Sequence, residues 1–460
     1  MSQHRLPTSP SVSSSRSSSF TRVYQRPESP TLPPENEGRS TRSYVDYHDN
    51  PTSPSHPTRS MPDISTATIH ETSTFQETKS RTRSKSRPSA SNSTTSSRTS
   101  RTKSTKLHKT PDHLATAIEI STTNAISSPA PAAGMYWSRT LTYGKGPSRP
   151  LRAHTANLIG DRLFVFGGCD TSSCFNTLYI LDMGRYKAML LDMITYGPPP
   201  CRAHSCTVVE KDLGYGKKSH QLYFFGGGNG PDYFQDVYVL DAETLTWSKP
   251  DIDPQSRPSK RRAHTSCLWE NKLVIIGGGD GARALDDVYM LDISKQGQLR
   301  WEKLDTTGRC PPARGYHTSN LVKDKLVVFG GSDGHDCFED IHVLDLKSAK
   351  WSQIELDKKI PRLAHTSTQV GSYVFVIGGH DGRRYSQEVL LFNLVTMSWE
   401  SRKIYGVAPN PRGYHTTVLY DSRLYVLGGY DGKNVFDDVH MLELSACAYL
   451  PQITNFEIDV

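Results

Sequence analysis

The chain has 460 residues, a formal net charge of +7 and 35% hydrophobic residues. Its apolar runs are short, which argues against a membrane-spanning helix or a secretory leader. Residues 1–111 contain 17 Lys and Arg against 8 Asp and Glu, and the remainder contains 37 against 39. The remainder is therefore nearly neutral and is not expected to bind polyanions in general.

Residues 1–134 are dominated by Ser, Thr, Arg and Pro, with isolated apolar residues. Such a segment cannot bury enough apolar surface to offset the entropy of ordering, so we predict a disordered basic tail. Residues that precede a proline are candidate phosphorylation sites, namely Ser9, Ser29, Ser53, Thr110 and Ser128.

Residues 78–111 of the tail carry ten basic residues and no acidic one. This segment could contact an anionic membrane or nucleic acid, direct nuclear import, or serve as a solvating linker. No aromatic residues lie between the basic ones, so stacking on nucleic-acid bases is not indicated.

After a strand predicted at about 135–142, one pattern recurs six times between residues 152 and 443: a histidine, a glycine pair and a closing, mostly acidic residue. The histidines are His154, His204, His264, His317, His365 and His415. The first glycines are Gly167, Gly226, Gly277, Gly330, Gly378 and Gly428, and the closing residues are Asp182, Asp241, Asp292, Asp345, Asn393 and Glu443. A period near fifty residues predicts identical units that are stacked or arranged radially.

Each unit contains three short runs of β-branched, aromatic or leucine residues bounded by turn residues, which predict strands. A fourth strand is predicted around a tryptophan that follows the third strand in four copies, at Trp247, Trp301, Trp351 and Trp399. Four antiparallel strands per unit are typical of a propeller blade. The first copy departs from the pattern, with Met189 near the expected tryptophan position.

The sixth copy has no tryptophan after its third strand. Trp137 lies seventeen residues before His154, which is also the interval between Trp247 and His264. We therefore predict that the strand at 135–142 is the outer strand of the last blade, beside residues 438–442, and closes the ring.

The histidine, the apolar run, the Gly-Gly pair, the Tyr-x-Leu-Asp element at 179–182 and 238–241, and the tryptophan resemble the kelch repeat. The resemblance covers residues 135–445 and implies an all-β, six-bladed kelch β-propeller. The predicted domains are the tail at 1–134, the propeller at 135–445 and a C-terminal extension at 446–460.

Equivalent positions in every blade spread the histidines round the ring, so hydrogen bonds to neighbouring blades are predicted instead of a metal centre. The recurrent Asp-Gly after the glycine pair predicts a turn, with a Ca²⁺ ring as the alternative. The eight cysteines follow neither the blades nor a zinc motif, so free thiols in a reducing cytosol are predicted. No metal, cofactor or obligate small molecule is expected.

Two sets of arginines accompany the histidines. Arg261, Arg314, Arg362 and Arg412 stand three residues before them, and Arg152, Arg202 and Arg262 stand two before. Either they line the mouth of the central channel and bind an acidic partner group, or they support turns.

The residues after the Asp-Gly turns differ in every copy, as expected of a scaffold that presents a recognition surface. In kelch proteins this face binds peptides, which makes these loop residues candidates for protein binding: Tyr233, Arg283, His335, Arg383, Arg384 and Lys433. No catalytic residue is predicted.

We predict a non-enzymatic, cytoplasmic protein-interaction scaffold, with the cell cortex or the nucleus as other locations. The resemblance implies adaptor roles in cell polarity, small-GTPase signalling or ubiquitin-ligase assembly. Two alternatives are an enzyme similar to galactose oxidase, which resembles kelch proteins in its blades, and a nucleus- or RNA-associated protein directed by the basic tail.

Overall fold

The computed structural model describes residues 134–144, 149–191, 197–212, 214–444 and 455–458. The predicted disordered tail, its basic segment and all five candidate phosphorylation sites lie outside these residues. Within them, no helix is long and apolar enough to cross a membrane.

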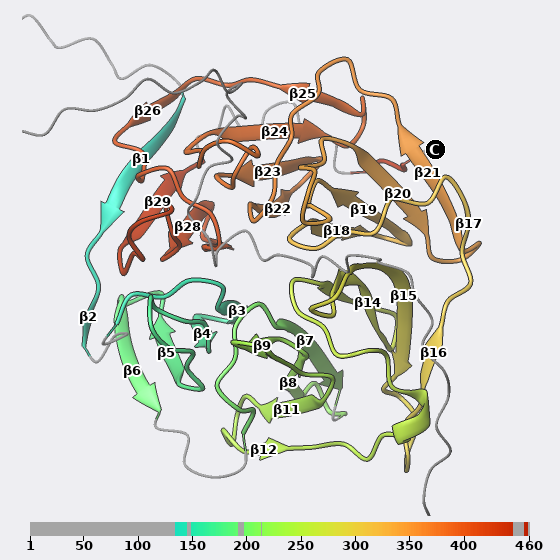
Figure 1. The fold of residues 1–460 in the computed structure, drawn as a ribbon. Coiled ribbons are helices and arrows are strands. Elements are labelled where there is room, and N and C mark those ends of the chain that lie inside the picture. Colours follow the sequence, from blue (N-terminus) through green and yellow to red (C-terminus); the bar gives the residue numbers. More distant parts are fainter. Residues whose placement is uncertain (1–133, 145–148, 192–196, 213, 445–454, 459–460) are drawn as a thin grey trace, which may run out of the picture.

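Six sheets are arranged radially round a central axis, with the first strand of each blade innermost and the fourth outermost (Figure 1). The all-β, six-bladed propeller predicted from the sequence is confirmed. The innermost strands of successive blades contact one another round the whole ring, in the order β3, β7, β13, β18, β22, β27 and back to β3.

Blade one contains β3 (Thr155–Ile159), β4 (Arg162–Phe166), β5 (Leu178–Asp182) and β6 (Lys187–Leu191). Blade two contains β7 (Ser205–Asp212), β8 (Lys218–Phe225), β11 (Val237–Asp241) and β12 (Trp247–Ser248), with the small hairpin of β9 (Gly228–Asn229) and β10 (Asp232–Tyr233) between β8 and β11. The 3-10 helix η1 (Pro254–Ser256) follows, and then blade three with β13 (Thr265–Trp269), β14 (Lys272–Gly279), β15 (Ala284–Asp292) and β16 (Trp301–Lys303).

Blade four contains β18 (Thr318–Val322), β19 (Lys325–Phe329), β20 (Ile341–Asp345) and β21 (Lys350–Ile354). Blade five contains β22 (Thr366–Val370), β23 (Tyr373–Ile377), β24 (Val389–Asn393) and β25 (Ser398–Glu400). Blade six combines β27 (Thr416–Tyr420), β28 (Arg423–Leu427) and β29 (Val439–Glu443) with β1 (Met135–Thr140) from the other end of the propeller.

The second strand of each blade is buried on both faces because it lies between two neighbouring blades. In β4, for example, the four residues after Arg162 are all buried. This environment explains why these strands read as continuous apolar runs and not as an alternation of apolar and polar residues.

The ring is closed by β1, which pairs antiparallel with β29 and places Trp137 opposite Leu442. The equivalent pair in blade two is Trp247 opposite Leu240. Trp137 is 5% exposed, so the strand contributes to the core as well as to the sheet.

Three blades gain a fifth, parallel strand from the segment that arrives from the preceding blade, and these strands were not predicted from the sequence. These strands are β2 (Tyr143–Gly144) on β6, β17 (Thr307–Gly308) on β21 and β26 (Ile404–Gly406) on β1. Gly406 ends its strand at φ 83°, and a Cβ there would lie 2.2 Å from the carbonyl oxygen of Trp137. Only glycine allows this approach.

In blade one, Ala188 pairs with Leu181 and so stands where the other blades place tryptophan. Met189, expected near the tryptophan position, is the next residue along the strand. Met189 is 51% exposed because successive side chains in a strand point to opposite faces.

The short stretch 455–458 packs against blades four and five. Ile458 is 6% exposed and lies in the same apolar cluster as Val327 and Val374, and Lys323 pairs with Glu457 at 3.6 Å.

Candidate protein-binding face

The six repeated histidines join neighbouring blades. His204 Nε2 lies 3.0 Å from Thr155 Oγ1 of the preceding blade. The five other histidines make the same contact at 2.8 to 3.1 Å, with Ser205, Thr265, Thr318, Thr366 and Thr416. The predicted hydrogen bonds between blades are confirmed. Among the described residues no group of three or more His, Cys, Asp or Glu could hold a metal ion.

The glycine pair makes room for these histidines. A Cβ on Gly226 would lie 2.9 Å from Cε1 of His264 and 2.7 Å from the carbonyl oxygen of Arg261. The backbone there also has φ 65°, which favours glycine.

The residues that precede the histidines form a closed circle of backbone hydrogen bonds. Ala203 N donates to Ala153 O, Ala263 N donates to Ala203 O, and the circle continues until Ala153 N donates to Tyr414 O, with distances of 2.7 to 2.9 Å. All six residues have φ between 52° and 59°. The same left-handed conformation in every blade lets each one contact the next round the axis.

The arginines three residues before the histidines support the fold. Arg314 is 1% exposed, and its guanidinium donates to both carboxylate oxygens of Asp340 at 2.6 and 3.0 Å and to Gly330 O at 2.9 Å. Arg314 and His342 hold the pKa of Asp340 below its usual range despite its burial. Equivalent pairs join Arg261 to Asp287, Arg362 to Glu388 and Arg412 to Asp438.

The arginines two residues before the histidines lie beside the loops between the second and third strands. Arg152 stacks over the Tyr430 ring at 4.4 Å, and Arg262 stacks over the Tyr233 ring at 4.5 Å. Each therefore contacts the preceding blade. Blades four to six have Gly315, Leu363 and Gly413 at this position, so the arginines occupy only one half of the ring.

The Asp-Gly segments are turns. Asp381 Oδ1 accepts hydrogen bonds from the backbone N–H groups of Arg383 and Arg384, both at 2.8 Å. Asp280, Asp333 and Asp431 accept the same pair of bonds in their own blades. The predicted turn role is confirmed, and each carboxylate is engaged by its own loop.

We define the loop face as the six loops between second and third strands, at 169–174, 228–233, 279–284, 332–337, 380–385 and 430–435. Five of the six candidate binding residues are exposed on it, namely Arg283, His335, Arg383, Arg384 and Lys433. The sixth, Tyr233, is half-buried because it packs on Arg262 and against Gly281 of the next blade.

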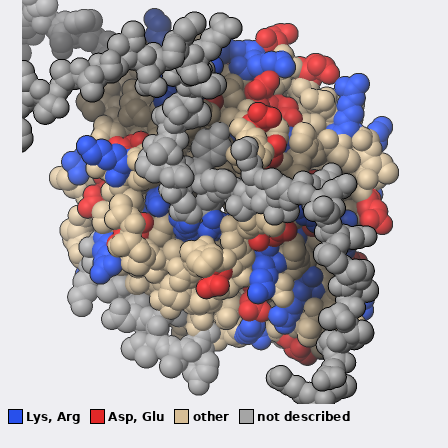
Figure 2. All heavy atoms as spheres, viewed as in Figure 1, with Lys and Arg blue, Asp and Glu red and all other residues tan. Residues whose placement is uncertain are grey.

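Acidic and basic side chains are interspersed on the face of the molecule in Figure 2. This distribution agrees with the nearly neutral composition of the propeller.

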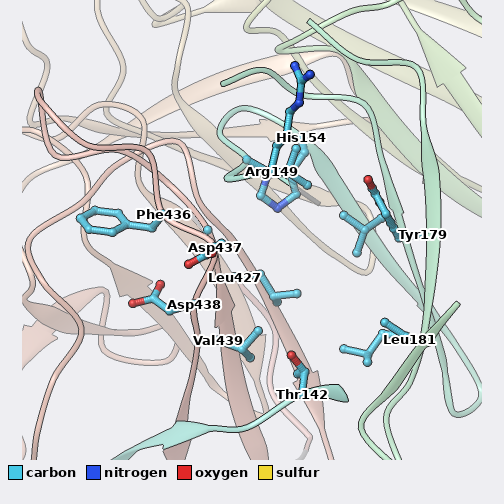
Figure 3. A pocket seen from close by; sticks show the side chains of 14 residues that line it. Thr142, Arg149, His154, Tyr179, Leu181, Leu427, Phe436, Asp437, Asp438 and Val439 are labelled. Atoms are coloured by element: carbon cyan, nitrogen blue, oxygen red, sulfur yellow. The ribbon is translucent and has the colours of Figure 1, made fainter. Parts of the chain in front are cut away.

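A cavity of about 60 Å³ lies between blades one and six (Figure 3). Val165, Leu181 and Ala188 line it from blade one, and Leu427 and Val439 line it from blade six. In blade two, the Trp247 ring packs on Phe224 and on Phe166 of the preceding blade. Val165 and Leu427 are the equivalents of those two residues, so the cavity occupies the place of the missing tryptophan. The interrupted repeat was visible in the sequence, but the cavity was not predicted.

The sequence matches the KLHDC2/KLHL20/DRC7 Kelch-repeats domain at residues 215–367 and 357–455, and the Kelch motif at residues 150–185. It is 29% identical over 230 residues to acyl-CoA-binding domain-containing protein 4 of Arabidopsis thaliana, a match that covers 47% of this chain and 32% of the relative.

Host cell factor 2 of Homo sapiens is 29% identical over 242 residues, with 45% of this chain and 29% of the relative covered. Tip elongation aberrant protein 1 of Schizosaccharomyces pombe is 27% identical over 215 residues, with 45% and 18% covered. The matches thus span a third or less of these relatives. With the domain match over more than half of its length and the six-bladed fold, the chain belongs to the kelch-repeat family.

Proposed function

We propose that this protein is a non-enzymatic interaction scaffold that binds partner proteins at its loop face. The observation that carries the proposal is the division of each repeat into a constant and a variable part. The histidines, glycine pairs and aspartates are engaged within the frame, whereas the loop tips differ between blades and are exposed. Rigid frames that display variable loops are suited to recognition.

The exposed tips of the loops in blades three, five and six carry Arg283, Arg383, Arg384 and Lys433, and these cations favour an acidic segment of the partner. The side chain of Arg283 is 79% exposed and that of Arg384 is 87% exposed. Arg383 and Lys433 are also exposed on the same face, and Arg152 and Arg262 lie further in. Arginine forks bind carboxylates in a bidentate manner, which makes such a cluster suited to acidic side chains.

The alternative of an oxidase is less well supported. A copper centre needs several ligands at one point, whereas the six repeated histidines are each hydrogen bonded to a Ser or Thr of the preceding blade. Measuring the copper content and oxidase activity of the purified protein tests this point, and stoichiometric copper with turnover would overturn the scaffold proposal.

We further propose a cytoplasmic location and a role in one of the processes named above, cell polarity, small-GTPase signalling or ubiquitin-ligase assembly. Proximity labelling with the intact chain identifies the partners. The same labelling with residues 78–111 deleted tests whether the basic segment sets the location. If it does, the labelled proteins should come from a different compartment.

Charge reversal at the loop face tests the binding proposal. We expect Arg383→Glu with Arg384→Glu to weaken binding of a partner identified by proximity labelling by about tenfold or more, because two exposed cations are replaced by anions. Isothermal titration calorimetry at two salt concentrations measures the effect.

The matched control is Lys217→Glu with Lys218→Glu, at the opposite end of a blade, where Lys217 ends the turn after β7 and Lys218 begins β8 and pairs with Glu210 at 2.6 Å. This variant makes the same change in charge and should bind normally. Unchanged affinity of the Arg383/Arg384 variant would show that the loop face is not the binding surface.

A further inference from the structure

In each blade, the loop between the second and third strands brings two residues face to face. The residue after the glycine pair faces the residue five positions later. These pairs are Gly228 with Tyr233, Gly279 with Ala284, Ser332 with Cys337, His380 with Tyr385 and Tyr430 with Val435. In blade one the pair is Cys169 with Cys174, the only one of the six with two thiols.

The backbone geometry at this pair suits a disulfide bond. Two backbone hydrogen bonds flank the pair, one on each side. Phe175 N donates to Gly168 O at 2.8 Å, and Asp170 N donates to Ser173 O at 3.1 Å. Cys169 and Cys174 are therefore a non-hydrogen-bonded antiparallel pair, for which Cα atoms lie about 4.5 Å apart and side chains are close. Disulfides require Cα separations of about 4.4–6.8 Å.

The surroundings favour a thiolate at Cys169. Both thiols are free in the structure. A hydrogen bond from Cys174 lowers the pKa of Cys169, with further help from Arg152 and Arg202 and against the effect of burial, and the same hydrogen bond raises the pKa of Cys174. Cys169 itself is 3% exposed, whereas Cys174 is half-buried and the intervening residues Thr171, Ser172 and Ser173 are exposed, so solvent reaches the pair from the Cys174 side of the loop. Low-pKa cysteines beside a second thiol are the usual targets of oxidation.

We propose that Cys169 and Cys174 form a redox modification site that a hydroperoxide converts reversibly into a disulfide. The Cys169 thiolate attacks the peroxide, so that an S–O bond forms, the O–O bond breaks and the alkoxide or hydroxide leaves as an alcohol or water after protonation. Cys174 then attacks the sulfenic sulfur, an S–S bond forms and water leaves. Two thiols are oxidised, one peroxide is reduced, and a thiol reductant restores the pair.

Peptide mass spectrometry tests the site in the full-length native protein. The protein is treated with hydrogen peroxide, remaining thiols are alkylated, and the chain is cut with trypsin. The tryptic peptide 163–185 contains Cys169, Cys174 and no other cysteine. We expect this peptide without alkyl groups and about 2 Da lighter than its reduced form, because two hydrogens are lost. Dithiothreitol should reverse the change.

Two single variants and a control define the pair. Cys169→Ser and Cys174→Ser should each abolish the 2 Da loss, as expected when one partner of a disulfide is removed, and Cys310→Ser, at an exposed cysteine elsewhere, should leave it intact. Thermal melting of the reduced proteins checks that the variants are folded. A wild-type peptide that gains oxygen on either cysteine without an internal link, or a link from either cysteine to Cys201, would overturn the proposal.

Discussion

At the scale of the residue, the repeated histidine is a buried neutral imidazole. All six are buried between two blades, with 4–7% of their surface exposed, and hydrogen bonded to the preceding blade. Burial lowers the pKa of His154 to about 4 and, with smaller contributions from nearby charges, those of His204, His317 and His415 to about 3. Those of His264 and His365 are also well below the ordinary value of 6.5, for the same reason.

These shifts predict that the propeller loses stability as the pH falls from about 6.5 to about 4. In the unfolded chain these histidines have the ordinary pKa near 6.5, and in the folded chain all six have a lower pKa, so in this interval the unfolded state binds more protons. Each histidine then contributes up to about 1.4 kcal/mol per pH unit. The measurement is the free energy of unfolding in urea at several pH values. A stability that stays constant between pH 7 and pH 5 would contradict this assignment.

A variant distinguishes the contribution of the histidines to the pH dependence of stability from that of the carboxylates, which titrate at lower pH. His154→Gln keeps a polar side chain but removes one titrating group, so the slope between pH 6 and pH 5 should fall by up to about one sixth if the six contribute equally. An unchanged slope would show that other groups cause the pH dependence.

At the scale of the element, strand register decides which copies are complete. Five blades place a tryptophan opposite an apolar residue of the third strand, whereas blade one places Ala188 opposite Leu181. The cavity between blades one and six results from that substitution. A one-residue difference in register separates a core position from an exposed one, as Ala188 and Met189 show.

Ala188→Trp is therefore expected to raise the free energy of unfolding by about 1–3 kcal/mol, the gain from burying a large apolar side chain. Urea denaturation followed by circular dichroism measures it. Met189→Trp is the matched control: it inserts the same side chain one residue later on the exposed face and should change stability by less than about 0.5 kcal/mol. A loss of stability for Ala188→Trp would show that the cavity cannot accept an indole.

At the scale of the whole molecule, the two ends of the propeller meet in one sheet. Met135 and Trp137 from β1 lie in the same apolar cluster as Leu424 and Leu442 from blade six. A closed ring leaves no gap between the first and last blades, and so the last blade has no exposed edge at β29.

Removing β1 should therefore be far more damaging than removing the tail. We expect a chain that begins at residue 134 to melt like the full-length protein, and one that begins at residue 142 to be strongly destabilised or to aggregate. Trp137→Ala is a milder test and should cost about 3–5 kcal/mol, the usual loss for a buried tryptophan. Differential scanning calorimetry compares the three. Equal melting temperatures for the two truncated chains would contradict the role of β1 in closing the ring.

Much of the fold could be predicted from the sequence because the repeated residues are those that each blade needs for its own local contacts. A histidine that reaches the preceding blade and a glycine pair that makes room for it recur in all six copies, and an aspartate that caps a turn recurs in five of them. The spacing of Trp137 from His154 matched that of a complete copy, which placed β1 in the last blade. The roles of the two sets of arginines could not be predicted in the same way. Arg261 and Arg262 are adjacent in the sequence, and only the direction of each side chain decides whether it contacts Asp287 or Tyr233.

The sequence by itself determined the number of blades, the order of their strands and the partner of the N-terminal strand, because these follow from spacing along the chain. The tertiary structure alone decided that Arg314 is buried against Asp340 while Arg152 stacks on Tyr430 of another blade. It also decided that Cys169 faces Cys174 beside Arg152 and Arg202, and that Ala188 leaves a cavity. Those contacts join residues that are far apart in the sequence or lie across a loop. They depend on the direction of each side chain and on closure of the ring, and the spacing of the repeat along the chain determines neither.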